Sequence, residues 1–340
     1  MRELTDSWQL DGLELPNRVA LAPLAGIGNW FVRLQARRYG AGLVVSEMVS
    51  SCAVHYRNER TWRELLRIDE RERAGGPVAI QLFGADPEMT RSAAAHVAAL
   101  GADLIDLNMG CPVPKVCKTG AGAALLDDGD RAVALARAAR EGSGLPVTVK
   151  LRSGRRAGET SGVLLARRLV TEAGVSAIGF HPRSALVGHR GAPDYALAAE
   201  LVRTLDAPVI LSGGLHTAQA TREAFEATGA SAVMLARGAL GNPWLFEELL
   251  GRRSAPPSDR EVLHELDWVI ARASEHLGTS RATRYLRRFY PWYLERLALE
   301  RAPARRLSSA VQQAESFARV RELLADAVED GSAKAVRVLV

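Results

Sequence analysis

The strongest constraint on the fold is a series of eight short apolar segments, each bounded by turn residues and followed by a stretch with helical spacing. The segments cover residues 19–26, 42–48, 77–84, 104–110, 146–152, 177–183, 208–214 and 232–238. Nearly continuous apolar strands that alternate with helices are typical of a parallel sheet covered on both faces. Eight such units in about 240 residues match the size of a TIM barrel, which has eight strand–helix units. The sequence therefore predicts an α/β fold, a TIM (β/α)8 barrel.

The polar residues at the ends of these segments also favour a barrel. Each segment closes on a polar or turn-forming tip, namely Pro23, Glu47, Gln81, Asn108, Lys150, His181, Ser212 and Arg237. In a TIM barrel the C-terminal ends of the strands form the rim that carries the active site. The main alternative is a doubly wound open sheet, but no GxGxxG follows the first strand and eight units exceed its usual number.

The chain changes character after the eighth unit. A helical stretch at residues 241–253 is followed by Pro256 and Pro257 within a short polar segment, and strand patterns do not return after residue 260. We therefore expect a barrel domain at residues 1–253 and a small all-α helical bundle at residues 254–340. Because proline is incompatible with a helix interior, Pro291 predicts a kink or a break near Tyr290.

The basic charge is concentrated in this C-terminal part. The chain has 44 basic and 39 acidic residues. Residues 281–306 contain eight arginines against Glu295 and Glu300, a net charge of +6 over 26 residues. Such a segment is consistent with contacts to a phosphate backbone, and equally with a solvated helix face.

Composition limits the class of protein. With 47% apolar and 24% charged residues, the chain can bury a sizeable core, which excludes a disordered or fibrous protein. No apolar run reaches the roughly 18 residues of a membrane span, and the first residues lack the layout of a signal peptide. We therefore expect a cytoplasmic protein that does not associate with a membrane. Three cysteines in a chain of this length argue against a disulfide framework.

Cys111 is the first candidate for a reactive group. It follows Gly110 at the tip of the fourth segment, and Pro112 prevents the strand from continuing, so the thiol is presented on a turn at the barrel mouth. There it could act as a proton donor, or it could be a buried cysteine that behaves as a small hydrophobe. Cys117 follows without histidine partners at ligand spacing, so we expect no metal site.

Further polar tips suggest a cofactor. Lys150 in an apolar strand could stabilise an anionic ring, and Gln81 could hydrogen-bond a heterocycle, although a surface lysine and a core glutamine are the simpler alternatives. Residues 212–214 and 236–238 lie at the seventh and eighth tips, the usual phosphate site of a TIM barrel. A glycine pair alone can also be a tight turn.

Taken together, these residues resemble the tRNA-dihydrouridine synthase family, and in particular its bacterial B-type branch. The similarity lies in APLAG, QLFG, DLNMGCPVPKVCKTGAGAALL, VKLR, HPRS, SGG and ARGALGNPWLF, at residues 22–26, 81–84, 106–126, 149–152, 181–184, 212–214 and 236–246. It extends through RYLRRFYPWYLERL at residues 284–297. The NxGCP element with its GAGAALL continuation is the most specific part. Given this resemblance, we interpret Cys111 as a functional residue rather than a buried structural cysteine.

This resemblance implies an FMN enzyme that uses NADPH to reduce the C5–C6 bond of selected uridines in tRNA. Hydride would pass from the reduced flavin to C6, and Cys111 would donate the proton to C5. The resemblance assigns cofactor contacts to Pro23, Leu24, Ala25, Gln81, Lys150, His181, Ser212, Gly213, Gly214, Ala236 and Arg237. It assigns substrate contacts to Asn108, Arg183, Arg287 and Arg288. We expect a monomer whose partner is tRNA.

Two departures from the family pattern leave alternatives open. Ser212-Gly213-Gly214 stands where Asn-Gly-Asp is usual, and His181-Pro182-Arg183 stands where His-Gly-Arg is usual. One alternative is a dihydroorotate-dehydrogenase-like FMN barrel that reduces a small pyrimidine or enone, which would not explain the basic helical tail. The other is a tRNA-binding protein that lacks flavin chemistry.

Overall fold

The computed structural model describes the backbone of residues 2–338 and the side chains of residues 2–328. The chain divides into two compact units. The first runs to Gly238 and also includes Leu245–Arg252, and the second comprises Ala239–Trp244 and the chain from Arg253 onward. The sequence predicted two domains, at residues 1–253 and 254–340. That these are separate functional domains remains a prediction.

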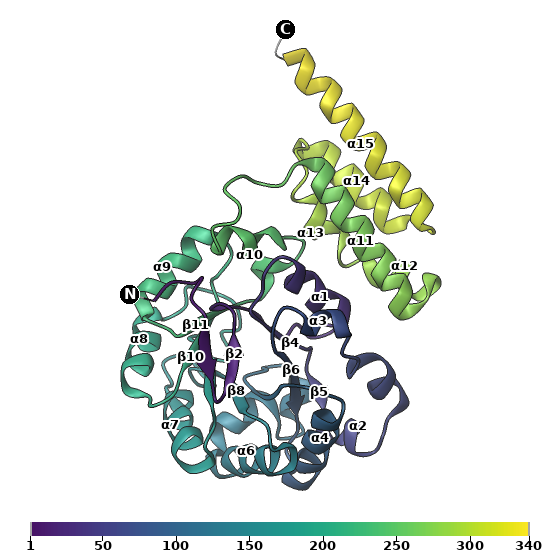
Figure 1. Ribbon diagram of the computed structural model, residues 1–340. Coiled ribbons are helices and arrows are strands. Elements are labelled where there is room, and N and C mark those ends of the chain that lie inside the picture. The colour runs from purple at the N-terminus through teal and green to yellow at the C-terminus, as the bar shows by residue number, and fades with distance from the viewer. Residues whose placement is uncertain (1, 339–340) are drawn as a thin grey trace. The chain divides into compact units, whose positions relative to one another are not determined.

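The first unit is a closed parallel barrel (Figure 1). Its strands are β3 (Val19–Leu21), β4 (Leu43–Val45), β6 (Val78–Phe83), β7 (Leu104–Met109), β8 (Val147–Arg152), β9 (Ala177–His181), β10 (Val209–Ser212) and β11 (Ala232–Leu235). Every neighbouring pair is parallel, and pairing of β4 with β6 closes the ring. A short strand, β5 (Val49–Ser50), extends the edge of β6. The predicted TIM barrel is confirmed, with each of the eight apolar segments supplying one strand.

An antiparallel hairpin that the sequence reasoning missed covers the apolar end of the barrel. It consists of β1 (Trp8–Leu10) and β2 (Leu13–Leu15). Asp11 and Gly12 between them both have positive φ, as a two-residue hairpin turn of type I′ requires. Leu10 and Leu15 are 1% exposed and join a buried cluster that includes residues near the strand starts, such as Leu43 and Leu104. The apolar core therefore fills this end and leaves the opposite end for polar side chains.

Helices and helical turns connect the strands and cover the outside of the barrel (Figure 1). The longer ones begin at side chains that cap them, such as Asp86, Asp128, Asp194 and Thr217, each of which accepts a backbone N–H of the first turn. The helices are α1 (Trp30–Arg38), α2 (Ser51–His55), α3 (Glu70–Arg73), α4 (Pro87–Ala99), α5 (Pro114–Cys117), α6 (Gly129–Ser143), α7 (Ser161–Ala173), α8 (Tyr195–Thr204), α9 (Ala218–Thr228) and α10 (Trp244–Leu249), with a π-helical turn at Thr61–Leu65 and 3₁₀ turns at Gly122–Asp127 and Arg237–Ala239.

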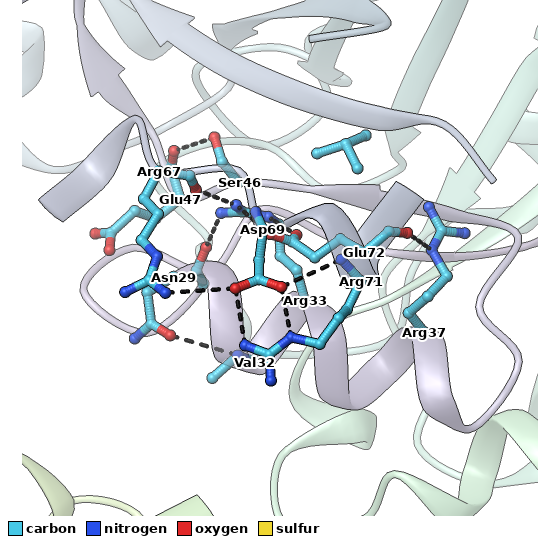
Figure 2. A network of polar contacts seen from close by, with 12 residues as sticks. Asn29, Val32, Arg33, Arg37, Ser46, Glu47, Arg67, Asp69, Arg71 and Glu72 are labelled. Atoms are coloured by element: carbon cyan, nitrogen blue, oxygen red, sulfur yellow. Dashed lines mark hydrogen bonds and ion pairs between the residues drawn. The ribbon is translucent and has the colours of Figure 1, made fainter. Parts of the chain in front are cut away.

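A buried ion pair joins α1 to α3 (Figure 2). Arg33 Nε lies 2.7 Å from Glu72 Oε2, and both side chains are 0% exposed. Arg33 also donates to the carbonyl of Arg67, and Glu72 accepts the backbone N–H of Asp69, closing a capping box at the start of α3. These contacts fix the segment after β4 against the helix that follows β3.

Replacing Glu72 with alanine should lower the free energy of unfolding by about 3–5 kcal/mol, because Arg33 is left as an unpaired buried charge. Urea denaturation of the full chain measures this loss. Glu59→Ala is the matched control, since Glu59 pairs with Arg63 at the surface and such pairs contribute about 0–1 kcal/mol. Equal losses in the two variants would show that Arg33 finds another partner.

The second unit is helical, as expected. Its helices are α11 (Asp259–Leu277), α12 (Thr279–Leu286), α13 (Tyr290–Leu294), α14 (Arg301–Gln313) and α15 (Phe317–Val338). Ser258 and Glu261 form a capping box at the start of α11. The break predicted from Pro291 is confirmed: α12 ends at Leu286, and Pro291 lies in the first turn of α13, where a missing N–H costs nothing. No helix of the described chain is both long and apolar enough to span a membrane.

Candidate active site

A pocket with a cavity volume of about 190 Å³, open to solvent, lies at the C-terminal end of the barrel strands. The pocket is lined by residues from the tips of all eight strands or from the loops after them: Ala22, Pro23, Ala25, Met48, Gln81, Asn108, Gly110, Cys111, Pro112, Lys150, Leu151, Arg152, His181, His189, Ser212, Gly213, Gly214, Leu215, His216, Ala236 and Arg237. Seven of the eight strand tips singled out from the sequence therefore converge on one pocket; the exception is Glu47, which accepts the backbone N–H of Gly26 while Met48 lines the pocket.

Most of the residues singled out from the sequence line this pocket. Those that do are Pro23, Ala25, Gln81, Asn108, Cys111, Lys150, His181, Ser212, Gly213, Gly214, Ala236 and Arg237. Leu24 is 8% exposed and belongs to the core beside the pocket, where its carbonyl accepts the N–H groups of Ile27 and Gly28. Arg183 is buried behind the lining and donates to the carbonyl of Gly191. Arg287 and Arg288 belong to the second unit.

Cys111 sits on a turn built by its neighbours after β7. The Asn108 side-chain oxygen accepts the N–H groups of Gly110 at 3.3 Å and of Cys111 at 2.9 Å. The carbonyl of Cys111 accepts the N–H of Ala123 at 2.9 Å. Burial raises the pKa of the Cys111 thiol, and nearby Arg152 opposes that rise. The thiol is thus held in place and kept protonated near neutral pH.

A buried polar chain lies beneath this turn. Gln81 donates to Asp106 at 2.6 Å and accepts from the Asn108 amide at 2.9 Å. Thr148 donates to the other oxygen of Asp106 at 2.6 Å. Burial raises the pKa of Asp106 to about 6, against the effect of these hydrogen bonds and of Lys150. This chain fixes the orientation of the Gln81 amide, and Asp106 is a supporting residue that the sequence reasoning did not single out.

Lys150 lies near the end of β8 with its ammonium group in the pocket. Its Nζ donates to the Ser212 hydroxyl at 2.9 Å, and that hydroxyl lies 3.3 Å from the carbonyl of Phe180. Burial lowers the pKa of Lys150 to about 8, with Arg152 acting in the same direction and Asp106 against it. The lysine is therefore cationic at neutral pH and has protons left for an anionic partner.

The turn after β10 requires glycine. Gly213 and Gly214 have φ of 96° and 83°, a region that other residues rarely adopt. A Cβ on Gly213 would lie 2.3 Å from the His181 ring, and one on Gly214 would lie 2.5 Å from the Tyr195 hydroxyl. Tyr195 also donates to the carbonyl of Gly213 at 3.0 Å. The two glycines thus make room for the His181 ring and the Tyr195 hydroxyl beside the pocket.

Several lining residues were missed by the sequence reasoning. Arg152 ends β8 two residues after Lys150, a spacing that places both side chains on one face and could have identified it. It donates to the carbonyls of Ser184 and Gly188 and so holds the loop after β9. That loop carries His189. Its ring stacks on the His181 ring, with 5.8 Å between the two ring centres. His189, Met48 and His216 lie in loops, where no periodic pattern marks a residue as facing the pocket.

The electrostatics of the pocket favour an anion. Lys150, Arg152 and Arg237 line it, and burial beside these cations lowers the pKa of His189 to about 4 and that of His181 further still. Both rings are therefore neutral at pH 7. No group of three or more metal-ligating side chains occurs in the part of the chain that the structure describes.

The fold and this pocket together define a TIM barrel with a cationic site at the C-terminal rim of its strands. A family model described as dihydrouridine synthase matches residues 20–329. The chain belongs to this family, and with it to the flavin-dependent oxidoreductases.

Individual relatives agree with this membership. The chain is 34% identical over 326 residues to tRNA-dihydrouridine synthase B of Pseudomonas aeruginosa, with 94% of this chain and 96% of the relative covered. It is 32% identical to tRNA-dihydrouridine synthase B of Xanthomonas axonopodis pv. citri, with 84% and 86% covered. It is 34% identical to a probable tRNA-dihydrouridine synthase 1 of Synechocystis, with 84% and 80% covered.

Solved structures share the barrel. Morphinone reductase is 19% identical with a TM-score of 0.53, covering 75% of this chain and 92% of its own. A 2-naphthoyl-CoA reductase complex is 12% identical with a TM-score of 0.61, covering 74% of this chain and 52% of its own. At these identities the likeness shows the fold alone.

Proposed function

We propose that this protein is an FMN-dependent tRNA-dihydrouridine synthase that uses NADPH to reduce the C5–C6 bond of specific uridines. The observation that carries the proposal is the joint exposure of Cys111 and Lys150 to one pocket at the barrel mouth. A protonated thiol there is a proton donor for carbon, and a cation there stabilises negative charge. A tRNA substrate also supports action in the cytoplasm. The expected monomeric state stays a prediction.

The pocket residues fit flavin mononucleotide. Arg237 and the glycine turn at Gly213 and Gly214 offer a cation and an open backbone to the phosphate and ribityl chain. Gln81 and Lys150 offer donors to the polar edge of the ring system, and Pro23 and Ala25 offer an apolar wall. When bound, the flavin supplies the hydride that adds to C6 of uracil. The Ser212 hydroxyl stands where the family usually has an amide, and here it orients the Lys150 ammonium.

The side chains of this protein then perform three tasks. Cys111 donates the proton to C5, because its raised pKa keeps the thiol loaded near neutral pH. Asn108 holds the Cys111 turn through its oxygen and donates its amide to Gln81, so its proposed effect on the target base is to position these two neighbours in the pocket. Lys150 balances the negative charge of the reduced cofactor. Arg183 donates to the carbonyl of Gly191 and so supports the loop after β9; we propose that it contributes to substrate binding by holding this loop.

The target uridine must leave its stack to enter such a pocket, so the protein needs a surface that grips the tRNA backbone. The arginine-rich segment at residues 281–306 has the charge for this purpose. Within it, the guanidinium of Arg288 lies 4.8 Å from the centre of the Tyr285 ring. We assign phosphate contacts to Arg287 and Arg288 in this segment.

The double variant Arg287→Ala with Arg288→Ala should weaken tRNA binding and flatten its dependence on salt. Each lost phosphate contact removes about one unit from the slope of log Kd against log salt, because fewer counterions are released. Titration of fluorescent tRNA at several salt concentrations measures the slope. A double variant at Arg137 and Arg203, exposed on α6 and α8, should keep it. An unchanged slope at Arg287 and Arg288 would make them part of a solvated helix face.

The reaction is tested by visible absorption of the purified protein. Flavin bands that NADPH bleaches and that tRNA lacking dihydrouridine restores without oxygen would establish the reaction. Bleaching that a small pyrimidine or enone reverses, while tRNA does not, would instead indicate a small-substrate reductase. A protein that binds tRNA but takes up no FMN would be a binding protein, and the Ser212–Gly214 departure would then be the place to look for the cause.

A further inference from the structure

Cys117 is a thiol beside the proposed acid that the reaction does not use. It ends α5, the single turn of helix that follows Cys111, and both thiols are half-buried. Its Sγ lies 3.3 Å from the carbonyl oxygen of Cys111, to which it donates. The Cys117 sulfur is therefore within hydrogen-bond distance of the Cys111 backbone, and Cys117 is one of the groups that raise the pKa of the Cys111 thiol.

The loop holds the two residues at this short range. The Cys111 carbonyl also accepts the N–H of Ala123, so residues 111–123 form a closed loop around it. A Cβ on Gly122 would lie 2.7 Å from the same oxygen, which shows how tightly the loop packs there. A disulfide requires Cα atoms within about 7 Å of each other. The contact from Cys117 Sγ to the Cys111 carbonyl brings the second cysteine to the backbone of the first. The third thiol, Cys52, is exposed and lies in α2, the short helix after β5.

Cys111 is open to oxidants because it lines the pocket. Its protonated thiol reacts slowly, since the thiolate is the nucleophile. If Cys111 donates its proton to substrate, as the proposed function states, each turnover leaves it as a thiolate until it is protonated again. Reduced flavins also yield hydrogen peroxide when oxygen takes the place of substrate. The reaction itself therefore exposes a thiolate to peroxide in the same pocket.

We propose that Cys111 and Cys117 form a reversible disulfide when the pocket meets a hydroperoxide, so that Cys117 protects the reacting thiol from irreversible oxidation. The Cys111 thiolate attacks one oxygen of hydrogen peroxide, which forms an S–O bond, breaks the O–O bond and releases hydroxide. The Cys117 sulfur then attacks the sulfenic sulfur, forms the S–S bond and expels the oxygen as water. In sum, two thiols and one peroxide give one disulfide and two waters.

The test treats the purified, flavin-loaded full chain with hydrogen peroxide and then with dithiothreitol. The native protein should lose two of its three free thiols and regain both on reduction. Trypsin cleaves after Lys115, so the disulfide should join a peptide of residues 92–115 to one of residues 116–118, a product that mass spectrometry identifies. The disulfide inactivates the enzyme for as long as it lasts.

The variant Cys117→Ser keeps a hydrogen-bond donor for the Cys111 carbonyl but removes the second sulfur. Its Cys111 should pass to sulfinic and sulfonic acid, and dithiothreitol should not restore it. Cys52→Ser should behave as the native protein does, and Cys117→Ala replaces the serine variant if that variant fails to fold. A native protein whose Cys111 oxidises as irreversibly as that of Cys117→Ser, or a disulfide that involves Cys52, would overturn the proposal. These readouts need no tRNA, so they stand apart from failure of the proposed function.

Discussion

Replacing Cys111 with alanine is expected to lower the rate of tRNA reduction by about 10²–10⁴-fold, the usual contribution of a positioned general acid. Flavin should stay bound and NADPH should still bleach it, because the cofactor contacts proposed above come from other strands. Single-turnover oxidation of the pre-reduced protein by tRNA, without oxygen, measures the lost step directly. Serine should not rescue the rate, since a hydroxyl is a far weaker acid than a thiol.

The pH dependence gives this prediction a second readout. The acid must be protonated, so the rate should fall as pH rises through the pKa of Cys111, which burial places above its ordinary value. Cys52→Ala, which changes an exposed cysteine away from the pocket, should leave both rate and profile unchanged. A Cys111→Ala protein that reduces tRNA at the native rate would remove this thiol from the mechanism.

The barrel could be predicted because its signal is local and repeated. Each apolar segment alternates with a helix, and each polar tip must lie at the C-terminal rim once the strands are parallel. The strand order alone therefore predicts that Gln81, Lys150 and Ser212 share one pocket, and the structure places all three in its lining. The hairpin β1–β2 was missed because two three-residue strands are too short to show a period, although Asp11-Gly12 is a recognised turn pair.

What the sequence could not give are features that depend on long-range packing. The loop after β9 brings His189 to the pocket because Arg152 holds its backbone at Ser184 and Gly188, a contact between residues more than thirty positions apart. The hydrogen bond from Lys150 to Ser212 spans 62 positions. It gives serine a physical task at position 212, since the hydroxyl supplies the acceptor for the Lys150 ammonium. Such a contact is visible only once the strands are assembled.

Replacing Lys150 with methionine is expected to slow flavin bleaching by NADPH about 10²–10³-fold, the usual cost of removing one preorganised electrostatic contact. Methionine keeps an unbranched apolar chain and removes the charge together with the hydrogen bond to Ser212. Anaerobic stopped-flow absorption measures the rate. Lys118→Met, at an exposed lysine outside the pocket lining, is the matched control and should keep the native rate.

The pH dependence of flavin bleaching and that of the free energy of unfolding separate the functional effect of Lys150 from its effect on stability. Its pKa in the folded chain, about 8, lies below the ordinary value of 10.5. The unfolded chain therefore binds more protons between these values, and this group makes the free energy of unfolding rise with pH across that window. Bleaching should show the opposite trend, because the lysine loses its charge as pH rises, and a bound anion will move that loss to a pH of 8 or above. Lys150→Met should abolish both trends at once. Their persistence in the variant would assign the charge balance of the reduced cofactor to Arg152 or Arg237 instead, since these are the other cations that line the pocket.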